Sequence, residues 1–204
     1  MKQIAAFLLE IEAVRFNVEQ PFVWSSGWRS PIYCDNRLIL SYPHIRTAVK
    51  DAFSALLEEK FGKEVGIAGV ATAGIAHGAL IADKLALPYL YVRSSPKAHG
   101  MKNMIEGRIS PNLPYVVIED LVSTGGSSMK VVEALRENEA EVAGMLAIFS
   151  YGFEQADLLF QNAKVPFFTL TNFDTLIEVA VEKNYLSSDQ ISTLQNWRKA
   201  PDKF

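Results

Sequence analysis

Four short apolar runs, separated for the most part by segments with helical spacing, constrain the fold of this chain more than any other feature. The runs cover residues 65–70, 87–92, 115–118 and 142–149. Strands that alternate with helical segments favour a parallel sheet whose connections cross over through helices. The sequence therefore predicts an α/β fold in which a central, mainly parallel sheet is flanked by helices.

Segments on either side of these runs complete the expected architecture. Apolar residues at helical spacing predict an amphipathic helix over residues 1–16 and a second helix over residues 44–61. Aromatic and β-branched residues broken by turn signals predict short strands within residues 22–34, which would form a small appendage. Residues 156–160 and 176–197 predict helices that pack on the sheet.

Composition and charge indicate one ordinary globular domain. The chain has 204 residues, of which 49% are hydrophobic, enough to bury a full core. The formal net charge is -3 and no long run of Lys or Arg is present, so we expect neither nucleic acid nor an anionic membrane as a partner. The apolar stretch at residues 4–9 is too short to cross a membrane. Cys34 is the only cysteine, which excludes an intrachain disulfide and fits a cytoplasmic protein.

The segment that follows the third apolar run carries the strongest functional pattern. Ligands of parallel sheets bind beyond the carboxyl ends of the strands, and here the run continues into Glu119 and Asp120. A turn rich in glycine and hydroxyl groups follows and opens a helix, an arrangement that suits a phosphate dianion. Adjacent carboxylates beside a phosphate require a metal ion or hydroxyl donors, so a sugar phosphate fits the whole segment. The turn consists of Ser123, Thr124, Gly125, Gly126, Ser127 and Ser128.

Residues 116–128 resemble the phosphoribosyl diphosphate motif of type I phosphoribosyltransferases. The simpler alternative on the residues alone is an acidic turn whose Ser123 or Thr124 caps a helix. The motif is not a Walker P-loop, because the GxxxxGK[ST] spacing is absent. The resemblance implies a type I phosphoribosyltransferase fold and a single domain over residues 1–204. It also implies that Glu119 and Asp120 bond the ribose hydroxyls, while the turn holds the phosphate of the ribose.

Residues 93–108 form a polar, glycine-bounded loop between the second and third runs. Its basic side chains, Arg93, Lys97, His99 and Lys102, would repel one another unless they close over an anion such as pyrophosphate. A solvated surface loop is the alternative. The loop resembles the catalytic loop of orotate phosphoribosyltransferases, which implies that these side chains bind phosphoribosyl diphosphate and that the loop is shared across a homodimer interface. The implied catalytic residues are Arg93, Lys97, His99 and Asp120.

A small-residue turn follows the first apolar run. Thr72, Ala73 and Gly74 lead into a helix and can present backbone N–H groups to an anion, or can instead allow close packing of helix and strand. The turn resembles the pyrophosphate loop of the same family, which makes these three residues candidate ligands for phosphoribosyl diphosphate. His77, further along, is expected to be a helix residue and not a catalyst.

The aromatic segment at residues 22–37 resembles the hood of orotate phosphoribosyltransferases, with its Ser-Gly, Ser-Pro and aromatic residues. The resemblance implies a hood of about residues 1–40 over a core of about residues 41–204. A hairpin whose aromatic rings only pack is the alternative. Arg29 and Arg37 are candidate partners for the orotate carboxylate. The candidate orotate-binding residues are Ser26, Tyr33, Cys34, Thr124 and Tyr151.

Together the resemblances imply an enzyme that transfers a phosphoribosyl group from phosphoribosyl diphosphate to orotate, giving orotidine monophosphate and pyrophosphate for pyrimidine (UMP) biosynthesis. They imply Mg²⁺ as cofactor, held mainly through the substrate with Asp120 as a candidate ligand. Two alternatives stay open: a phosphoribosyltransferase for another base, and a non-catalytic regulator that binds phosphoribosyl diphosphate. The second is favoured by non-basic residues where many family members carry a basic one. These are Ser25, Ala73, Ser94, Ser95 and Tyr151.

Overall fold

The computed structural model of the chain describes residues 1–24, 26–93 and 104–204, and its centre is a six-stranded sheet. The strands are β5 (Gly66–Val70), β6 (Tyr89–Val92), β7 (Ile105–Glu106), β8 (Tyr115–Val122), β9 (Val142–Ser150) and β10 (Phe167–Asn172). They lie in the order β10-β9-β8-β5-β6-β7, and every neighbouring pair is parallel except β6 and β7. The expected mainly parallel sheet is confirmed.

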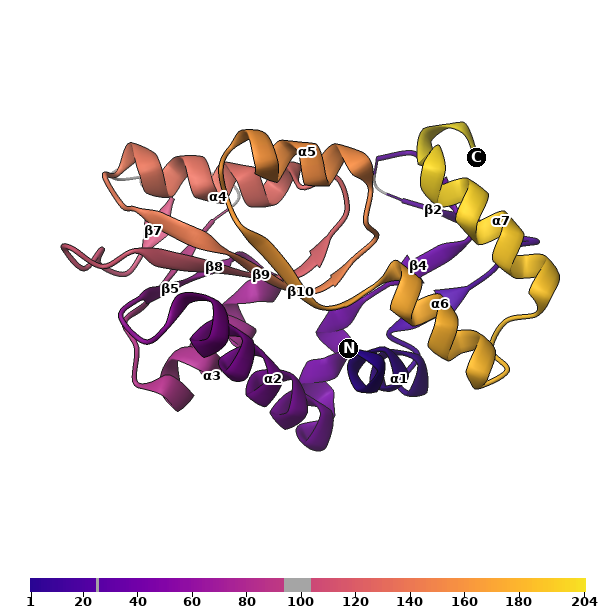
Figure 1. Cartoon of the computed structure of the whole chain (residues 1–204), viewed down its shortest axis with the longest axis horizontal. Coiled ribbons are helices and arrows are strands. Elements are labelled where there is room, and N and C mark those ends of the chain that lie inside the picture. The colour runs from indigo at the N-terminus through magenta and orange to yellow at the C-terminus, as the bar shows by residue number, and fades with distance from the viewer. Residues whose placement is uncertain (25, 94–103) are drawn as a thin grey trace.

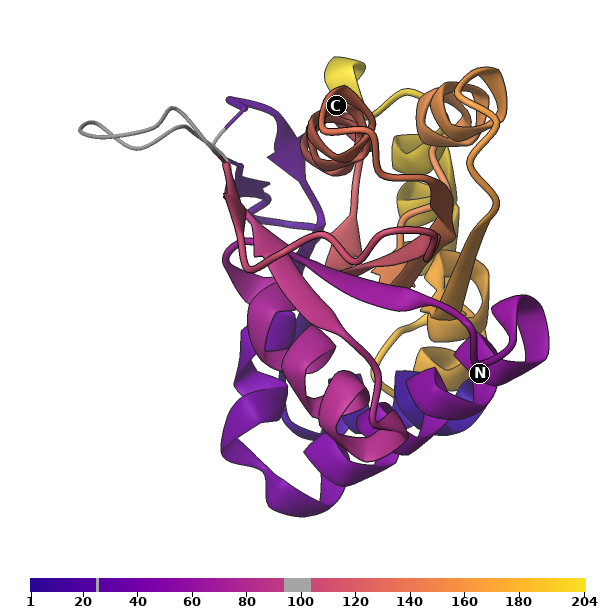
Figure 2. The ribbon, with the colours of Figure 1, turned by 90° about the vertical axis from the view of Figure 1, so that its left-hand side faces the viewer.

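Helices cover both faces of this sheet (Figures 1 and 2). Helices α4 (Gly126–Glu137) and α5 (Glu154–Asn162) lie on one face, and α2 (Pro43–Phe61) and α3 (Ala73–Leu85) lie on the other. Alternate residues of β8 enter the two cores: Val116 and Ile118 pack on the α2 and α3 side, and Val117 packs on the α4 side. Because both faces are buried, the strands read as continuous apolar runs. Among the described helices, none is long and apolar enough to cross a membrane.

The N-terminal segment departs from the expected helix over residues 1–16. Helix α1 (Lys2–Glu10) stops early, because Glu12 adopts a left-handed φ of 55° and the chain then extends into β1 (Val14–Phe16). Strand β1 pairs antiparallel with β4 (Ile32–Cys34), and β2 (Phe22–Val23) pairs with β3 (Arg29–Ser30). Strands β2, β3 and β4 are the short strands expected within residues 22–34. The 3-10 helix η1 (Asn36–Ser41) then leads into α2.

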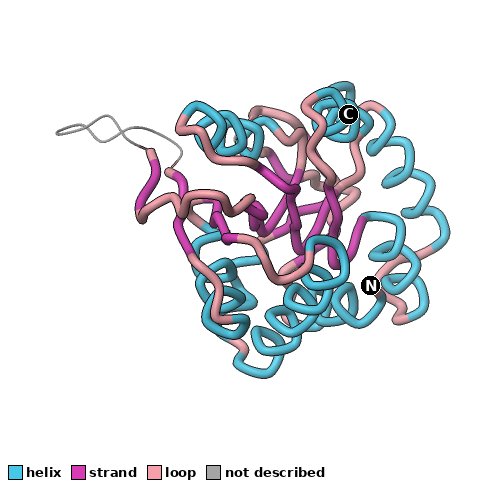
Figure 3. Tube along the Cα trace, turned by 60° about the vertical axis from the view of Figure 1, so that its left-hand side comes forward, coloured by secondary structure: helices cyan, strands magenta, loops and turns pink. Residues whose placement is uncertain are grey.

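The two C-terminal helices pack against different parts of the molecule (Figures 1 and 3). Helix α6 (Phe173–Glu182) contacts α1 and β10, as expected for a helix that packs near the sheet. Helix α7 (Ser188–Lys199), followed by the 3-10 helix η2 (Pro201–Lys203), lies beside the N-terminal strands. There the indole Nε1 of Trp197 donates a hydrogen bond of 3.2 Å to the carbonyl oxygen of Arg29. The expectation that this last helix packs on the sheet is therefore wrong.

Candidate active site

Two adjoining cavities lie where β5 and β8 end and the N-terminal strands meet the sheet. The first, the hood cavity, has a volume of about 480 Å³, and the second, the acidic cleft, one of about 400 Å³. Cys34 and Leu121 line both, so the two cavities share a wall. The other residues of the hood cavity are Val23, Trp24, Ser26, Trp28, Tyr33, Ser123, Thr124 and Tyr151. The other residues of the acidic cleft are Asp35, Arg37, Val70, Ala71, Thr72, Ala73, Glu119, Asp120 and Ser127.

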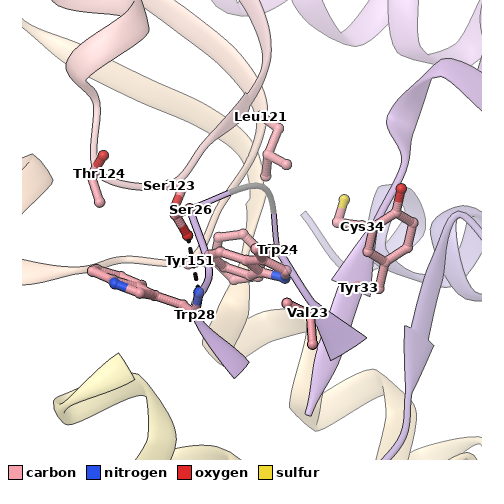
Figure 4. A pocket seen from close by; sticks show the side chains of 10 residues that line it. All are labelled: Val23, Trp24, Ser26, Trp28, Tyr33, Cys34, Leu121, Ser123, Thr124 and Tyr151. Atoms are coloured by element: carbon pink, nitrogen blue, oxygen red, sulfur yellow. Dashed lines mark hydrogen bonds between the residues drawn. The ribbon is translucent and has the colours of Figure 1, made fainter. Parts of the chain in front are cut away.

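The hood cavity is formed by aromatic rings and neutral hydrogen-bonding groups. In Figure 4, Tyr33 on β4 faces the cavity from one side, and Thr124, in the turn after β8, faces it from the other. Among the described lining residues there is no Asp, Glu, Lys, Arg or His. Burial raises the pKa of the Cys34 thiol and of the Tyr151 phenol well above their ordinary values, so both stay protonated. Such a cavity suits a flat ring with polar edges.

The acidic cleft concentrates two carboxyl groups at the end of β8. The strand runs four residues beyond the expected end of the run, so Glu119 and Asp120 are strand residues that project from a fixed backbone. Glu119 is only 5% exposed, and its Oε1 accepts a hydrogen bond of 3.0 Å from the Asp120 N–H. Burial, and next the charge of Asp120, raise the pKa of Glu119 well above its ordinary value, and burial also raises the pKa of Asp120. Buried carboxyl groups with a raised pKa are typical of a binding or catalytic site.

The glycine-rich turn connects the acidic cleft to helix α4. Gly125 has a φ of 82°, a left-handed conformation that favours glycine, and α4 begins at the next residue. The unsatisfied N–H groups of this helix start lie beside Ser127, which lines the cleft. Ser128 differs: its hydroxyl is buried and faces the Glu119 carboxyl group, so it is occupied within the protein. Of the two serines, Ser127 is therefore the one placed to meet a ligand.

The small-residue turn after β5 divides between the acidic cleft and the packing of α3 on the sheet. Thr72 and Ala73 line the acidic cleft. Gly74 packs instead, because a Cβ added there would overlap the carbonyl oxygen of Ile118 on β8. His77 is a buried α3 residue, as expected, and burial lowers its pKa to about 4. It is therefore a neutral side chain at physiological pH and lines neither cavity.

The basic side chains proposed to bind anions lie in different parts of the structure. Arg93 follows β6, and its guanidinium lies 3.7 Å from the Glu106 carboxylate of β7. Arg37 lines the acidic cleft and makes a two-bond ion pair with Asp35, at 2.6 and 2.9 Å. Arg29 is exposed on β3 and lines neither cavity, so the hood cavity receives neither candidate arginine. Ser25, Ser94, Ser95, Lys97, His99 and Lys102 lie outside the described residues.

Two residues at this site were not among the candidates taken from the sequence. Asn36 is fully buried, and its side-chain Nδ2 donates a hydrogen bond of 2.7 Å to the carbonyl oxygen of Asp120. Trp197 is 1% exposed and packs behind the Trp24 and Tyr151 rings of the hood cavity. Both contacts join segments far apart in the chain, which local patterns do not reveal.

Comparison with known proteins agrees with this geometry. The model of the phosphoribosyl transferase domain family matches residues 37–158. An orotate phosphoribosyltransferase of Cytophaga hutchinsonii is 54% identical over 200 residues, which cover 98% of this chain and 96% of the relative. One of Bacteroides thetaiotaomicron is 52% identical over 194 residues, covering 95% and 92%. The crystal structure of orotate phosphoribosyltransferase from Aeropyrum pernix matches with a TM-score of 0.73 at 30% identity, covering 86% of this chain and 97% of that one. The chain therefore belongs to the orotate phosphoribosyltransferase family.

Proposed function

We propose that this protein transfers the phosphoribosyl group from phosphoribosyl diphosphate to orotate and so supplies orotidine monophosphate for UMP synthesis. The observation that carries the proposal is the shared wall between the two cavities. A neutral, aromatic cavity suits a pyrimidine ring, and the adjoining cleft offers carboxylates for ribose hydroxyls and a helix start for a phosphate. The two reacting partners would therefore meet at Cys34 and Leu121.

In the proposed reaction the orotate ring nitrogen attacks the anomeric carbon of the ribose. The bond from that carbon to the diphosphate oxygen breaks, pyrophosphate leaves with the electron pair, and the ring nitrogen gives up its proton to solvent. Positive charge develops on the ribose as this bond lengthens, and the carboxylates of Glu119 and Asp120 would stabilise it from within the cleft. The turn at Ser127 would hold the phosphate, and Thr72 and Ala73 would border the diphosphate. Catalysis is then mostly alignment and charge stabilisation.

The acidic cleft fits the Mg²⁺ that phosphoribosyltransferases use with phosphoribosyl diphosphate. Within the described residues no group of three or more His, Cys, Asp and Glu side chains is placed to hold a metal, so the protein offers no complete cage. Mg²⁺ is commonly bound by one or two carboxylates together with substrate phosphates and water. We propose that Asp120 contributes to such a substrate-held ion. When bound, Mg²⁺ would neutralise charge on the departing diphosphate.

We also propose that the basic loop assists the departure of pyrophosphate and is shared between the subunits of a homodimer. Its support is the family resemblance of residues 93–108 together with Arg93, which stands at the end of β6 beside the cleft strand β5. Lys97, His99 and Lys102 would contribute further positive charge. The division into a hood of about residues 1–40 and a core of about residues 41–204, and the cytoplasmic location, also stay predictions.

A panel of bases tests the proposed activity. Orotate consumption would be followed by ultraviolet absorbance with phosphoribosyl diphosphate and Mg²⁺, and adenine, hypoxanthine, guanine and uracil would be tested in parallel by pyrophosphate release. We expect turnover of orotate alone. Turnover of another base would overturn the assignment of the hood cavity to orotate but would still support the assignment of the acidic cleft to phosphoribosyl diphosphate. If none of the five bases were turned over, the non-catalytic regulator would be favoured.

The two glycines of the phosphate turn allow binding to be separated from folding. A Cβ added at Gly126 meets nothing within 4 Å, so Gly126→Ala should fold with unchanged or higher thermal stability. The added methyl group stands at the helix start, where it would crowd the phosphate, so we expect KM for phosphoribosyl diphosphate to rise by roughly tenfold. Gly125→Ala is the comparison: its φ of 82° makes that variant strained and lowers Tm. An unchanged KM in Gly126→Ala would argue against phosphate binding at this turn.

A further inference from the structure

Asn36 lines neither the hood cavity nor the acidic cleft, but its side chain is hydrogen-bonded to residues that line them. It is fully buried at the start of η1 and is absent from the residues that line the hood cavity and the acidic cleft. Its side-chain amide makes two hydrogen bonds, one to Cys34 and one to Asp120. Burying a polar side chain costs free energy unless its polar groups are hydrogen-bonded, and both groups of the Asn36 amide are bonded here.

The chemistry of the partners sets the direction of both bonds. The carbonyl oxygen of Asp120 can only accept, so the amide atom 2.7 Å from it is the Nδ2 donor. The amide oxygen of Asn36 therefore faces Cys34, whose Sγ donates to it at 3.2 Å. This requires a protonated thiol, and burial raises the pKa of Cys34 accordingly. The bridge thus runs from a thiol of the hood cavity, through one amide, to the backbone of a cleft acid.

The hydrogen bond from Asn36 means that both backbone polar groups of Asp120 are bonded. The Asp120 N–H is held by the side chain of Glu119 at 3.0 Å, and its carbonyl oxygen is held by Asn36. With both of its polar groups bonded, the backbone that carries the Asp120 carboxyl group is held in place. We infer that Asn36 is a positioning residue that aligns the Asp120 carboxyl in the cleft with the base cavity beside Cys34. This inference rests on the proposed transfer between the two cavities.

The test compares Asn36→Ala with Asn172→Ala. Asn172 caps α6, because its Oδ1 accepts a hydrogen bond of 3.0 Å from the Thr175 N–H, and it lines neither cavity, so its loss is the same chemical change at a remote place. Both variants should lose a few degrees of Tm. We expect Asn36→Ala alone to lose at least about tenfold in kcat/KM for phosphoribosyl diphosphate, because a small misplacement of a catalytic group has a large kinetic effect. Asn172→Ala should keep the wild-type kcat and both KM values.

Three outcomes separate the possibilities. If wild-type protein turns over no orotate, the proposed function fails, whatever the variants do. If wild type is active and Asn36→Ala matches Asn172→Ala in kcat and both KM values, the positioning role is wrong. Should Asn36→Ala not accumulate as folded protein, Asn36→Ser serves instead, because its shorter hydroxyl cannot reach both partners. It should show the same loss in the same constants, and wild-type kinetics in Asn36→Ser would overturn the inference.

Discussion

Asp120→Asn is expected to lower kcat for orotate phosphoribosylation by about 10²–10³-fold with little change in the fold. Asparagine has nearly the shape of aspartate but no charge, and Asp120 lines the acidic cleft beside Glu119. Its carboxylate is most stabilising when positive charge develops on the ribose, so the loss should fall on kcat more than on KM. Steady-state kinetics at saturating phosphoribosyl diphosphate and Mg²⁺ measures the effect.

The same variant should be more stable than wild type. Burial raises the pKa of both Glu119 and Asp120, which means that desolvation penalises the charged form of each carboxyl group in the folded state. Removing one charge relieves that penalty, and we expect the free energy of unfolding at neutral pH to rise by about 1 kcal/mol. The control is Asp51→Asn, which breaks an exposed ion pair of 2.8 Å with Lys84 and should leave kcat unchanged. If kcat and stability fell together in Asp120→Asn, the carboxyl would be structural.

The features predicted from sequence are those that neighbouring residues determine. The buried run into β8, the two acids, the turn at Gly125 and the start of α4 follow one another along the chain, so their order in space is fixed by covalent connection. The parallel sheet could be predicted because strands buried on both faces need continuous apolar runs. Local pattern was therefore sufficient for the part of the acidic cleft that β8 and the turn after it contribute.

Elements decided by distant partners were not predictable in this way. Helical spacing continues past Glu10, but pairing of β1 with β4 extends residues 14–16 instead, because strand formation depends on what lies alongside. Strand β10 is the edge strand beside β9, and its partly exposed residues leave no clear run of buried positions. The bonds from Asn36 and from Trp197 span 84 and 168 positions of the sequence. No window of local sequence contains both ends of such a contact.

The hood cavity depends on the C-terminal helix through one side chain. Trp197 on α7 is 1% exposed, and its ring lies 5.7 Å from Trp24, 5.6 Å from Tyr151 and 5.4 Å from Phe153, measured between ring centroids. Its Nε1 also holds the carbonyl oxygen of Arg29 at 3.2 Å. Trp24 and Tyr151 line the cavity directly, whereas Trp197 does not. It therefore supports the cavity from behind.

Trp197→Ala is expected to lower the free energy of unfolding by about 3–5 kcal/mol, as for other buried aromatic residues cut to alanine. Because the rings that line the hood cavity lose their support, KM for orotate should rise by roughly tenfold, and KM for phosphoribosyl diphosphate should change less. Trp197→Phe keeps a ring but loses the bond to Arg29, so about 1–2 kcal/mol should be lost with a smaller change in KM. Thermal unfolding and steady-state kinetics measure these effects.

Phe53→Ala provides the control for a general loss of stability. Phe53 is a fully buried aromatic residue of α2 that lines neither cavity, so its removal should cost a similar free energy and leave KM for orotate unchanged. The three tryptophans of the chain, Trp24, Trp28 and Trp197, all belong to the aromatic group around the hood cavity. Their fluorescence should therefore respond to orotate in wild type and in Phe53→Ala, and more weakly in Trp197→Ala. If Trp197→Ala and Phe53→Ala shared one KM for orotate, α7 would stabilise the fold without shaping the base cavity.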